Sequence, residues 1–310
     1  GSIMSELLKK QKFGVEVEFT GITREMAAKA VQEIVGGTIS GPKRDAYYTR
    51  TIKDSQRRTW KVMRDSSISP KTNVGTANID EYRVEFVTPP LKYEDIETLQ
   101  NIIRKFKEIG GVPHSSCGIH IHIDGANHTA TSLRRMVNFM LSRQEIIYEA
   151  LGVGERKNRW CKPICKSLYD TMKKESNLTK DKAEQIWYSE ANDHYWGGVN
   201  HDHYNETRYH ALNLHSFFSK GTVEFRLFNS TLHAGRIKAY IQFCLALSAW
   251  SIESTGKVVF RSVSGYSADK KVTLMYHILT NRLGLYGDDF KTCRFHMMKN
   301  LKENTATTAA

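Results

Sequence analysis

The stretch Ile119-His120-Ile121-His122-Ile123 alternates apolar and imidazole side chains without a break. Successive residues of a β-strand point to opposite faces of a sheet. This stretch therefore predicts a strand with three isoleucines on one face and both histidines on the other. Alternation of this kind is typical of an antiparallel sheet that buries only one face. The function then depends on which groups join the two histidines.

Three other segments alternate in the same way, and each gathers charged side chains on one face. In order, the pairs are Glu16 with Glu18, Arg83 with Glu85 (preceded on the same side by Glu81), and Glu224 with Arg226. Any one of these strands, taken alone, fits an ordinary half-exposed strand equally well. Solvent-facing sides of strands usually mix Thr, Ser, Lys and Gln, however, whereas these four faces carry almost only Glu, His and Arg. The joint pattern favours a functional surface.

The chemistry of these faces indicates a site for divalent cations and phosphate. Carboxylate oxygens suit Mg²⁺ or Mn²⁺, and a histidine nitrogen is compatible with Mn²⁺. Several acidic groups packed together repel one another unless cations lie between them. Guanidinium groups match the geometry of phosphate oxygens. We therefore expect one hollow in which carboxylates hold metal ions and arginines hold a nucleotide.

Helical patterns separate the expected strands. The fold class that results is α+β, an antiparallel sheet with helices packed on one face. Thr23 as an N-cap and Gly36-Gly37 as a stop delimit the first of these helices. The expected helices are residues 23–35, 93–109, 131–151, 180–187, 236–252, 269–283 and 290–301. Residues 38–68 are expected to form hairpin strands, and residues 209–215 a further strand.

Six segments also resemble the motifs of a known family, and they occur in that family's order. They are residues 13–19 ("GvEiEf"), 65–68 ("DgSi"), 84–91 ("EivSpPl"), 117–123 ("CGlHvHv"), 208–214 ("RyxxlNl") and 221–228 ("GTiEfRlf"), with a weaker echo of "Rxxycxp" at 159–163. The family is that of the amidoligases, the COOH–NH2 ligases of the glutamine synthetase and glutamate–cysteine ligase superfamily. Two departures stand out: Ser66 replaces the usual glycine, and residues 166–205 contain no motif of the family.

The resemblance implies a fold, an activity and a role for each site residue. The fold would be the curved antiparallel sheet of the glutamine synthetase type. The activity would be ATP- and Mg²⁺-dependent joining of a carboxylate to an amine through an acyl phosphate. By the resemblance, the cation at the ATP phosphates would be held by Glu16, His120 and Glu224, and the cation at the substrate carboxylate by Glu18, Glu85 and Glu81. Phosphoryl or carboxylate groups would be bound by Arg226 and Arg208, and the nucleotide cavity would be lined by Asn213, His122 and Arg83. The proton acceptor would be Glu85 or Asp65.

The composition is consistent with such an enzyme and suggests its partners. The chain has 310 residues, a net charge of +12 and five cysteines. The positive charge indicates that the carboxylate substrate or the amine substrate is negatively charged overall, either free or attached to a peptide, protein or nucleic acid. The odd cysteine count and the absence of a long apolar run or a secretory signal lead us to expect a cytoplasmic protein without a membrane partner. We expect a catalytic domain at 13–255 with an insertion at about 155–205, a basic helical extension at 256–302 and a disordered tail at 303–310.

Several other interpretations are open at this stage. His120 and His122 with a glutamate could hold zinc in a hydrolase, although no HExxH helix accompanies them. Cys117 could be a nucleophile, although it projects from the face opposite His120. A non-enzymatic, nucleic-acid-binding protein is the remaining alternative. Its candidate clamp consists of Tyr47, Tyr48, Arg50, Arg57, Arg58, Trp60 and Lys61.

Overall fold

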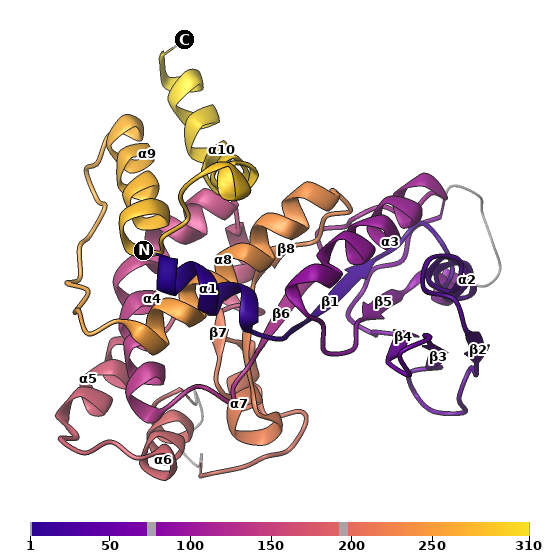
Figure 1. Cartoon of the computed structure of the whole chain (residues 1–310), viewed down its shortest axis with the longest axis horizontal. Helices are drawn as coiled ribbons and strands as arrows, with labels where there is room; N and C mark the ends of the chain where they lie inside the picture. Colours follow the sequence, from indigo (N-terminus) through magenta and orange to yellow (C-terminus); the bar gives the residue numbers. More distant parts are fainter. Residues whose placement is uncertain (1, 73–78, 192–197, 310) are drawn as a thin grey trace. The chain divides into compact units, whose positions relative to one another are not determined.

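The computed structural model describes residues 2–72, 79–191 and 198–309, and their side chains from residue 6 to residue 303 (Figure 1). Helices and antiparallel strands alternate along the chain, which confirms the α+β class. The chain divides into two compact units. Unit I consists of Lys12–Ile121 and Phe228–Ile241, and unit II of Gly1–Gln11, His122–Leu227 and Gln242–Ala310.

Unit I is built on strands in the order β2-β3-β4-β5-β1-β6. Its β1–β5 and β4–β5 pairs are antiparallel and place Glu18 and Met63 on either side of Glu85. The elements are β1 (Phe13–Phe19), α2 (Arg24–Val35), β2 (Thr38–Ser40), β3 (Arg50–Lys53), β4 (Thr59–Met63), η1 (Ile79–Tyr82), β5 (Val84–Val87), η2 (Tyr93–Asp95), α3 (Ile96–Glu108) and the first half of β6 (Gly118–Asp124).

The apolar face of this sheet is covered by helices, as the alternating strands predict. Phe106 of α3 stacks on Phe19 of β1, with ring centroids 4.7 Å apart, and meets Phe86 of β5 edge-on at 5.2 Å. Trp60 of β4 lies against the same Phe86 and is fully buried. α2 packs beside α3 and over β2 to β5. The glutamates of β1 and β5 therefore point to the face away from the helices.

Local signals account for the bounds of α2. The hydroxyl of Thr23 accepts a hydrogen bond from the backbone N–H of Met26, a cap typically worth about 1 kcal/mol. Gly36 ends the helix with φ 79°, a conformation that costs glycine little and other residues more. The predicted cap and stop are both confirmed.

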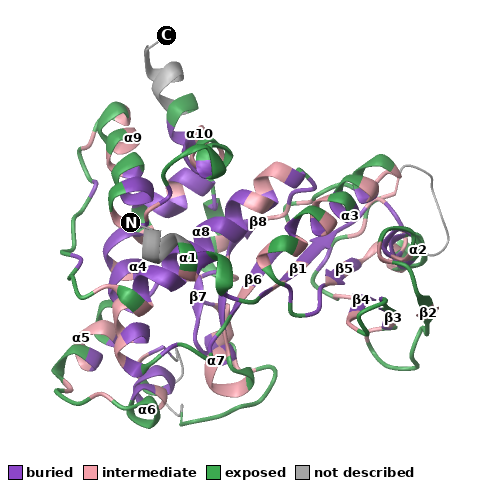
Figure 2. Ribbon diagram, in the orientation of Figure 1, coloured by how far each residue is buried: buried purple, intermediate pink, exposed green. Residues whose placement is uncertain are grey.

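Unit II combines strands in the order β6-β8-β7 with a set of helices. α4 and α8 are buried over most of their length (Figure 2) and meet where Phe139 contacts Trp250 at 5.5 Å. Its elements are α1 (Ser2–Lys10), α4 (Ala130–Leu151), η3 (Gly154–Asn158), α5 (Lys166–Lys174), α6 (Lys180–Glu190), η4 (Glu206–Tyr209), β7 (Leu212–Asn213), α7 (His215–Lys220), most of β8 (Thr222–Asn229), the C-terminal part of α8 (Ala234–Glu253), α9 (Ala268–His277), the π-turn η5 (Ile278–Arg282), η6 (Asp288–Phe290) and α10 (Lys291–Ala309).

The structure differs from the sequence expectations in three places. Residues 209–215 are not one strand, because η4 and α7 enclose a strand of only two residues, β7. The insertion at 155–205 contains α5, which we did not predict, as well as α6; its residues 192–197 lie outside the described part. α10 runs to Ala309 over most of the expected disordered tail, of which residue 310 is not described. Among the described residues, no helix has the length and apolarity needed to cross a lipid bilayer.

Candidate functional site

Three carboxylates of unit I meet on the charged face of its sheet. Glu18 and Glu85 are direct partners in the β1–β5 register, and Asp65 follows the end of β4, whose Met63 pairs with Glu85. Each of the three offers an oxygen, and these oxygens lie within 4.8 Å of one another. We call Glu18, Asp65 and Glu85 the carboxylate cluster. Such a set of hard oxygen donors fits Mg²⁺ or Mn²⁺.

Hydrogen bonds favour the charged form of Asp65 in the carboxylate cluster despite burial. Burial raises the pKa of Asp65, but hydrogen bonds from Glu18 and Ser67 outweigh it, and the net pKa is below the usual range. Glu18 is 6% exposed, and the backbone N–H of Gly118 donates to its Oε1 at 2.8 Å. A hydrogen bond between two carboxyl groups requires a proton between them. A divalent cation bound between these carboxylates would offset their mutual repulsion.

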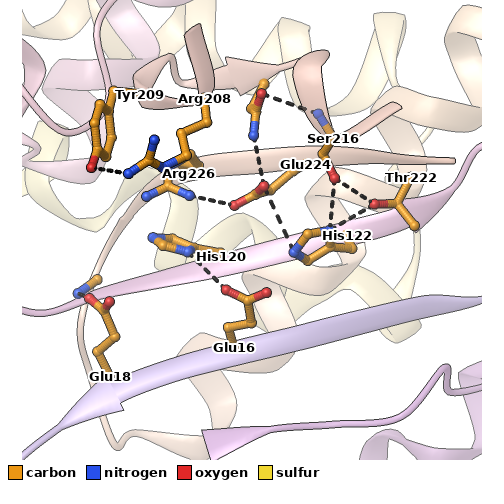
Figure 3. Close-up of polar contacts among 12 residues, drawn as sticks. Glu16, Glu18, His120, His122, Arg208, Tyr209, Ser216, Thr222, Glu224 and Arg226 are labelled. Atoms are coloured by element: carbon orange, nitrogen blue, oxygen red, sulfur yellow. Dashed lines mark hydrogen bonds and ion pairs between the residues drawn. The ribbon is translucent and has the colours of Figure 1, made fainter. Parts of the chain in front are cut away.

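A second pair of predicted residues meets next to this cluster along β1. Glu16 lies two residues before Glu18 on the same face, and its Oε2 is 3.1 Å from Nδ1 of His120 on β6 (Figure 3). The His120 side chain is only 7% exposed. A carboxylate bonded to one ring nitrogen fixes the orientation of the imidazole, as it does in many metal sites.

In unit II, Glu224 is the centre of a separate polar group. Arg226 donates to its Oε1 at 2.8 Å, and the side-chain amide of Asn213 donates to its Oε2 at 2.8 Å (Figure 3). Nε2 of His122 lies 3.9 Å from Oε2. Asn213 reaches Glu224 because the two are direct partners in the β7–β8 register. All four of these predicted residues are thus brought together.

Two hydroxyl residues complete this group, and the sequence analysis missed both. Oγ1 of Thr222 and Nδ1 of His122 are 2.8 Å apart, and Ser216 bonds the same threonine at 2.8 Å. Thr222 could have been recognised, because it precedes Glu224 by two residues and so shares its strand face. Ser216 carries no such signal, since it lies in the short helix α7.

Two arginines of unit II surround one tyrosine. The guanidinium carbon of Arg208 lies 4.2 Å from the centre of the Tyr209 ring, and that of Arg226 lies 5.6 Å from it. Arg208 also donates to the Tyr209 hydroxyl. Burial lowers the pKa of Arg208, and the nearby charge of Arg226 lowers it further. Two like charges held this close favour binding of an anion such as phosphate.

The structure places two predicted residues elsewhere in unit I. Arg83 donates to the backbone oxygen of Ile68 at 2.8 Å and forms an ion pair with Asp80. These contacts anchor the loop, so we no longer assign Arg83 to the nucleotide. Glu81 is exposed on η1 and lines a cavity that contains no member of the carboxylate cluster.

One alternative interpretation loses its candidate nucleophile, and another loses two of its seven candidate residues. Trp60 is fully buried and donates its indole N–H to Asp54, and Arg58 is bonded to both Asp54 and Asp95, so neither is available to clamp a nucleic acid. Burial, together with the charge of Glu18, raises the pKa of the Cys117 thiol to about 12. The thiol is therefore protonated at neutral pH and is a poor nucleophile.

Comparison with known proteins identifies the family of the chain. A family model described as "Putative amidoligase enzyme" matches residues 9–248, so the chain belongs to the amidoligase family. The match spans every site residue named above and confirms the resemblance read from the motifs. No curated protein matches the chain.

Among solved structures, the chain is similar to a bifunctional glutathione synthetase from Pasteurella multocida. The identity is 14% and the TM-score 0.42, with 98% of this chain and 48% of that chain covered. The chain thus spans about half the length of that protein.

Proposed function

We propose that this amidoligase is an ATP-dependent carboxylate–amine ligase that works through an acyl phosphate, on a sheet of the curved glutamine synthetase type. The observation that carries the proposal is the carboxylate cluster, in which three acidic groups share a space of 4.8 Å. Without a cation, the three carboxylates repel one another and destabilise the fold. A ligase that uses ATP needs divalent cations at the ATP phosphates.

Two groups of residues fit the metal ions. The carboxylate cluster would hold the cation nearest the substrate carboxylate. Glu16 and His120, which already contact each other, would hold the cation at the ATP phosphates together with Glu224. His120 and His122 support this assignment, because they lie two residues apart on β6 and leave it on the same side. Bound there, Mg²⁺ supplies positive charge against the phosphate oxygens.

The chain's own residues then serve a two-step reaction. In the first step an oxygen of the substrate carboxylate attacks the γ-phosphorus of ATP, and ADP leaves. Arg226, held in orientation by Glu224, stabilises the charge on the phosphoryl group in transit, and Arg208, which lies beside the same Tyr209 ring, assists.

In the second step the amine attacks the acyl carbon, and inorganic phosphate leaves. The amine nitrogen loses a proton as the amide bond forms. Glu85 is the proposed acceptor of that proton. Asp65 suits this role less, because its lowered pKa makes it a weak base and a better cation ligand.

The direct test measures the nucleotide product. The protein is incubated with ATP, Mg²⁺ and a panel of carboxylic acids, and hydroxylamine replaces the unknown amine. An acyl phosphate would be trapped as a hydroxamate, with one ADP released for each. Steady formation of AMP would contradict this chemistry.

Isosteric variants then connect the activity to the site. Glu16→Gln and Glu224→Gln are each expected to abolish ADP release while the melting temperature stays near or above that of the parent. Glu33→Gln is the matched control, because Glu33 is 61% exposed and pairs only with Lys105 among the described residues. Full activity in either site variant would refute the assignment.

The acid and the amine remain open within this proposal. The net charge of +12 supports acidic substrates, free or attached to a peptide, protein or nucleic acid. A reducing, cytoplasmic setting stays a prediction.

A further inference from the structure

Unit I contains a cavity of about 430 Å³ outside the carboxylate cluster. Its walls come from the start of α2, the segment that leads into β3, and η1. Tyr48 and Ile79 are apolar parts of the lining, while Arg24, Arg50 and Glu81 are charged parts. A volume of this size is in the range of pockets that hold small ligands.

One wall of the cavity is a rigid ion network. Arg24 is 5% exposed, and its Nη1 donates to the backbone oxygens of Asp80 at 2.8 Å and Arg83 at 3.0 Å. The carboxylate of Asp80 accepts from Arg24, Arg64 and Arg83. Arg24 and Asp80 therefore pair with each other and with residues around η1. They line the cavity, but the atoms that make these contacts do not pair with a ligand.

Two other charged residues of the lining are not committed in this way. Within the described part of the chain, Arg50 and Glu81 form no side-chain hydrogen bond or ion pair, either with each other or with a third residue. The remaining acidic residue of the wall, Glu25, pairs with Lys29 at 3.4 Å. The cavity thus offers one available cation and one available anion.

The apolar lining lies with these two charges. Tyr48 is 46% exposed, and the guanidinium carbon of Arg24 lies 5.4 Å from the centre of its ring. Ile79 is likewise 46% exposed. Tyr48 also has φ 45°, a left-handed conformation that is costly for a bulky residue and often occurs at binding sites.

The cavity lies at the same end of the sheet as the carboxylate cluster. Arg50 of β3 pairs with Val62 of β4, and the next residue of β4, Met63, pairs with Glu85. Glu81 precedes Glu85 by four residues along the chain. Because paired residues leave a sheet on the same side, Arg50 shares the helix-covered face with Val62, whereas Glu85 shares the opposite face with Met63.

We propose that this cavity binds a zwitterion, namely a short peptide whose carboxylate pairs with Arg50 and whose ammonium group pairs with Glu81. The peptide side chains rest on Tyr48 and Ile79. A ligand with charges of both signs is favoured because it can pair with both wall residues at once. This binding does not rest on the proposed ligase function.

The test is calorimetric titration without nucleotide or Mg²⁺. Alanyl dipeptides with each of the twenty residues at the second position are screened, and the tightest is compared with its N-acetylated and C-amidated forms. Each blocked form is expected to bind at least about tenfold more weakly to the parent protein, the loss typical of one partly buried charge pair. If no dipeptide binds, or if the blocked forms bind equally well, the proposal fails. Loss on amidation alone would show a plain anion site and would also overturn it.

Variants locate each charge in the cavity. Glu81→Gln should abolish discrimination against the N-acetylated form only, and Arg50→Gln discrimination against the C-amidated form only. Glu25→Gln, in the same wall but paired with Lys29, is the control and should keep both. Melting temperatures verify that every variant is folded, and unchanged discrimination in folded Arg50→Gln and Glu81→Gln proteins would refute the assignment.

The two proposals fail separately. Glu224→Gln, which removes the proposed ligase activity, should bind the dipeptide with parental affinity. A protein that binds the dipeptide but releases no ADP would contradict the ligase and leave the zwitterion site in place.

Discussion

Glu18→Gln is expected to stabilise the metal-free protein and to remove its response to Mg²⁺. In the parent, the oxygens of Glu18, Asp65 and Glu85 lie within 4.8 Å of one another. Two full charges at that distance repel by about 3.5 kcal/mol at an effective dielectric constant of 20. Hydrogen bonds from Ser67 to Asp65 and from the Gly118 N–H to Glu18 reduce this cost, so we expect about 1–2 kcal/mol to remain at neutral pH.

The glutamine removes that residual repulsion and retains the local hydrogen bonds. Its amide oxygen accepts from the backbone N–H of Gly118 as the carboxylate does, and its amide N–H donates to Asp65 without needing a proton from solvent. The melting temperature in EDTA should therefore rise by about 2–4 °C. In the parent, Mg²⁺ at one hundred times its dissociation constant should add about 2.7 kcal/mol to the free energy of unfolding.

The assay is thermal unfolding of both proteins in EDTA and in a Mg²⁺ series. The parent should show a melting temperature that increases with Mg²⁺, and Glu18→Gln should show a higher value in EDTA with no dependence on Mg²⁺. Glu33→Gln, which changes an exposed residue of helix α2 that pairs with Lys105, should behave as the parent. A variant that is less stable in EDTA and still responds to Mg²⁺ would show that the carboxylate cluster is not a metal site.

Three further outcomes are expected. Arg226→Met should lower kcat by about a thousandfold or more, with Arg226→Lys intermediate, because Glu224 orients a guanidinium fork that lysine lacks; a loss confined to KM would contradict this role. Burial lowers the pKa of His128 to about 4, so the unfolded state binds a proton near pH 6.5 that the folded state does not bind. The free energy of unfolding should therefore fall by up to about 3 kcal/mol from pH 7 to pH 4. Denaturant titrations across this range should show a smaller fall for His128→Gln. Asp54→Ala should destabilise the protein by about 3 kcal/mol in urea titrations, since it leaves the buried indole N–H of Trp60 without an acceptor, whereas a change below 1 kcal/mol would show that water replaces the carboxylate.

The reliable expectations were those that depend on short stretches of chain. β1, β6 and β8 were recognised because period-two alternation is a property of the strand itself. The ends of α2 were recognised because a threonine cap and a glycine stop act on backbone groups within four residues. The family motifs lie on these same elements.

The expectation for residues 209–215 was wrong for a reason beyond local sequence. His215 begins α7 instead of ending a strand. Its Nδ1 is 2.6 Å from the hydroxyl of Tyr188, and its Nε2 is 2.9 Å from the backbone oxygen of Asp202. These partners lie 27 and 13 residues away along the chain, and alternation alone does not report them.

The basic, aromatic segment around Trp60 illustrates the same point. Its composition left an exposed clamp open as an alternative, yet Asp54 accepts hydrogen bonds from Trp60 and Arg58 and holds these two side chains against the protein. A carboxylate six residues away was visible in the sequence. Its choice of partners was not, because it depends on the turn between β3 and β4.

The sequence alone determined which faces carry charge, since alternation decides the side from which each side chain leaves its strand. Glu16, Glu18, Glu85, His120 and Glu224 were named on that ground. Only the tertiary structure decided which of these groups meet, because strand register and loop course set distances between residues far apart in the chain.

That difference explains the remaining assignments. Asp65 joins Glu18 and Glu85 because β4 ends opposite β5. Arg83 is no longer assigned to the nucleotide because it forms an ion pair with Asp80. Arg50 and Glu81 line the same cavity because the start of β3 and η1 lie on the same side of unit I. No local pattern encodes these encounters, since each depends on the packing of segments that are separate in sequence.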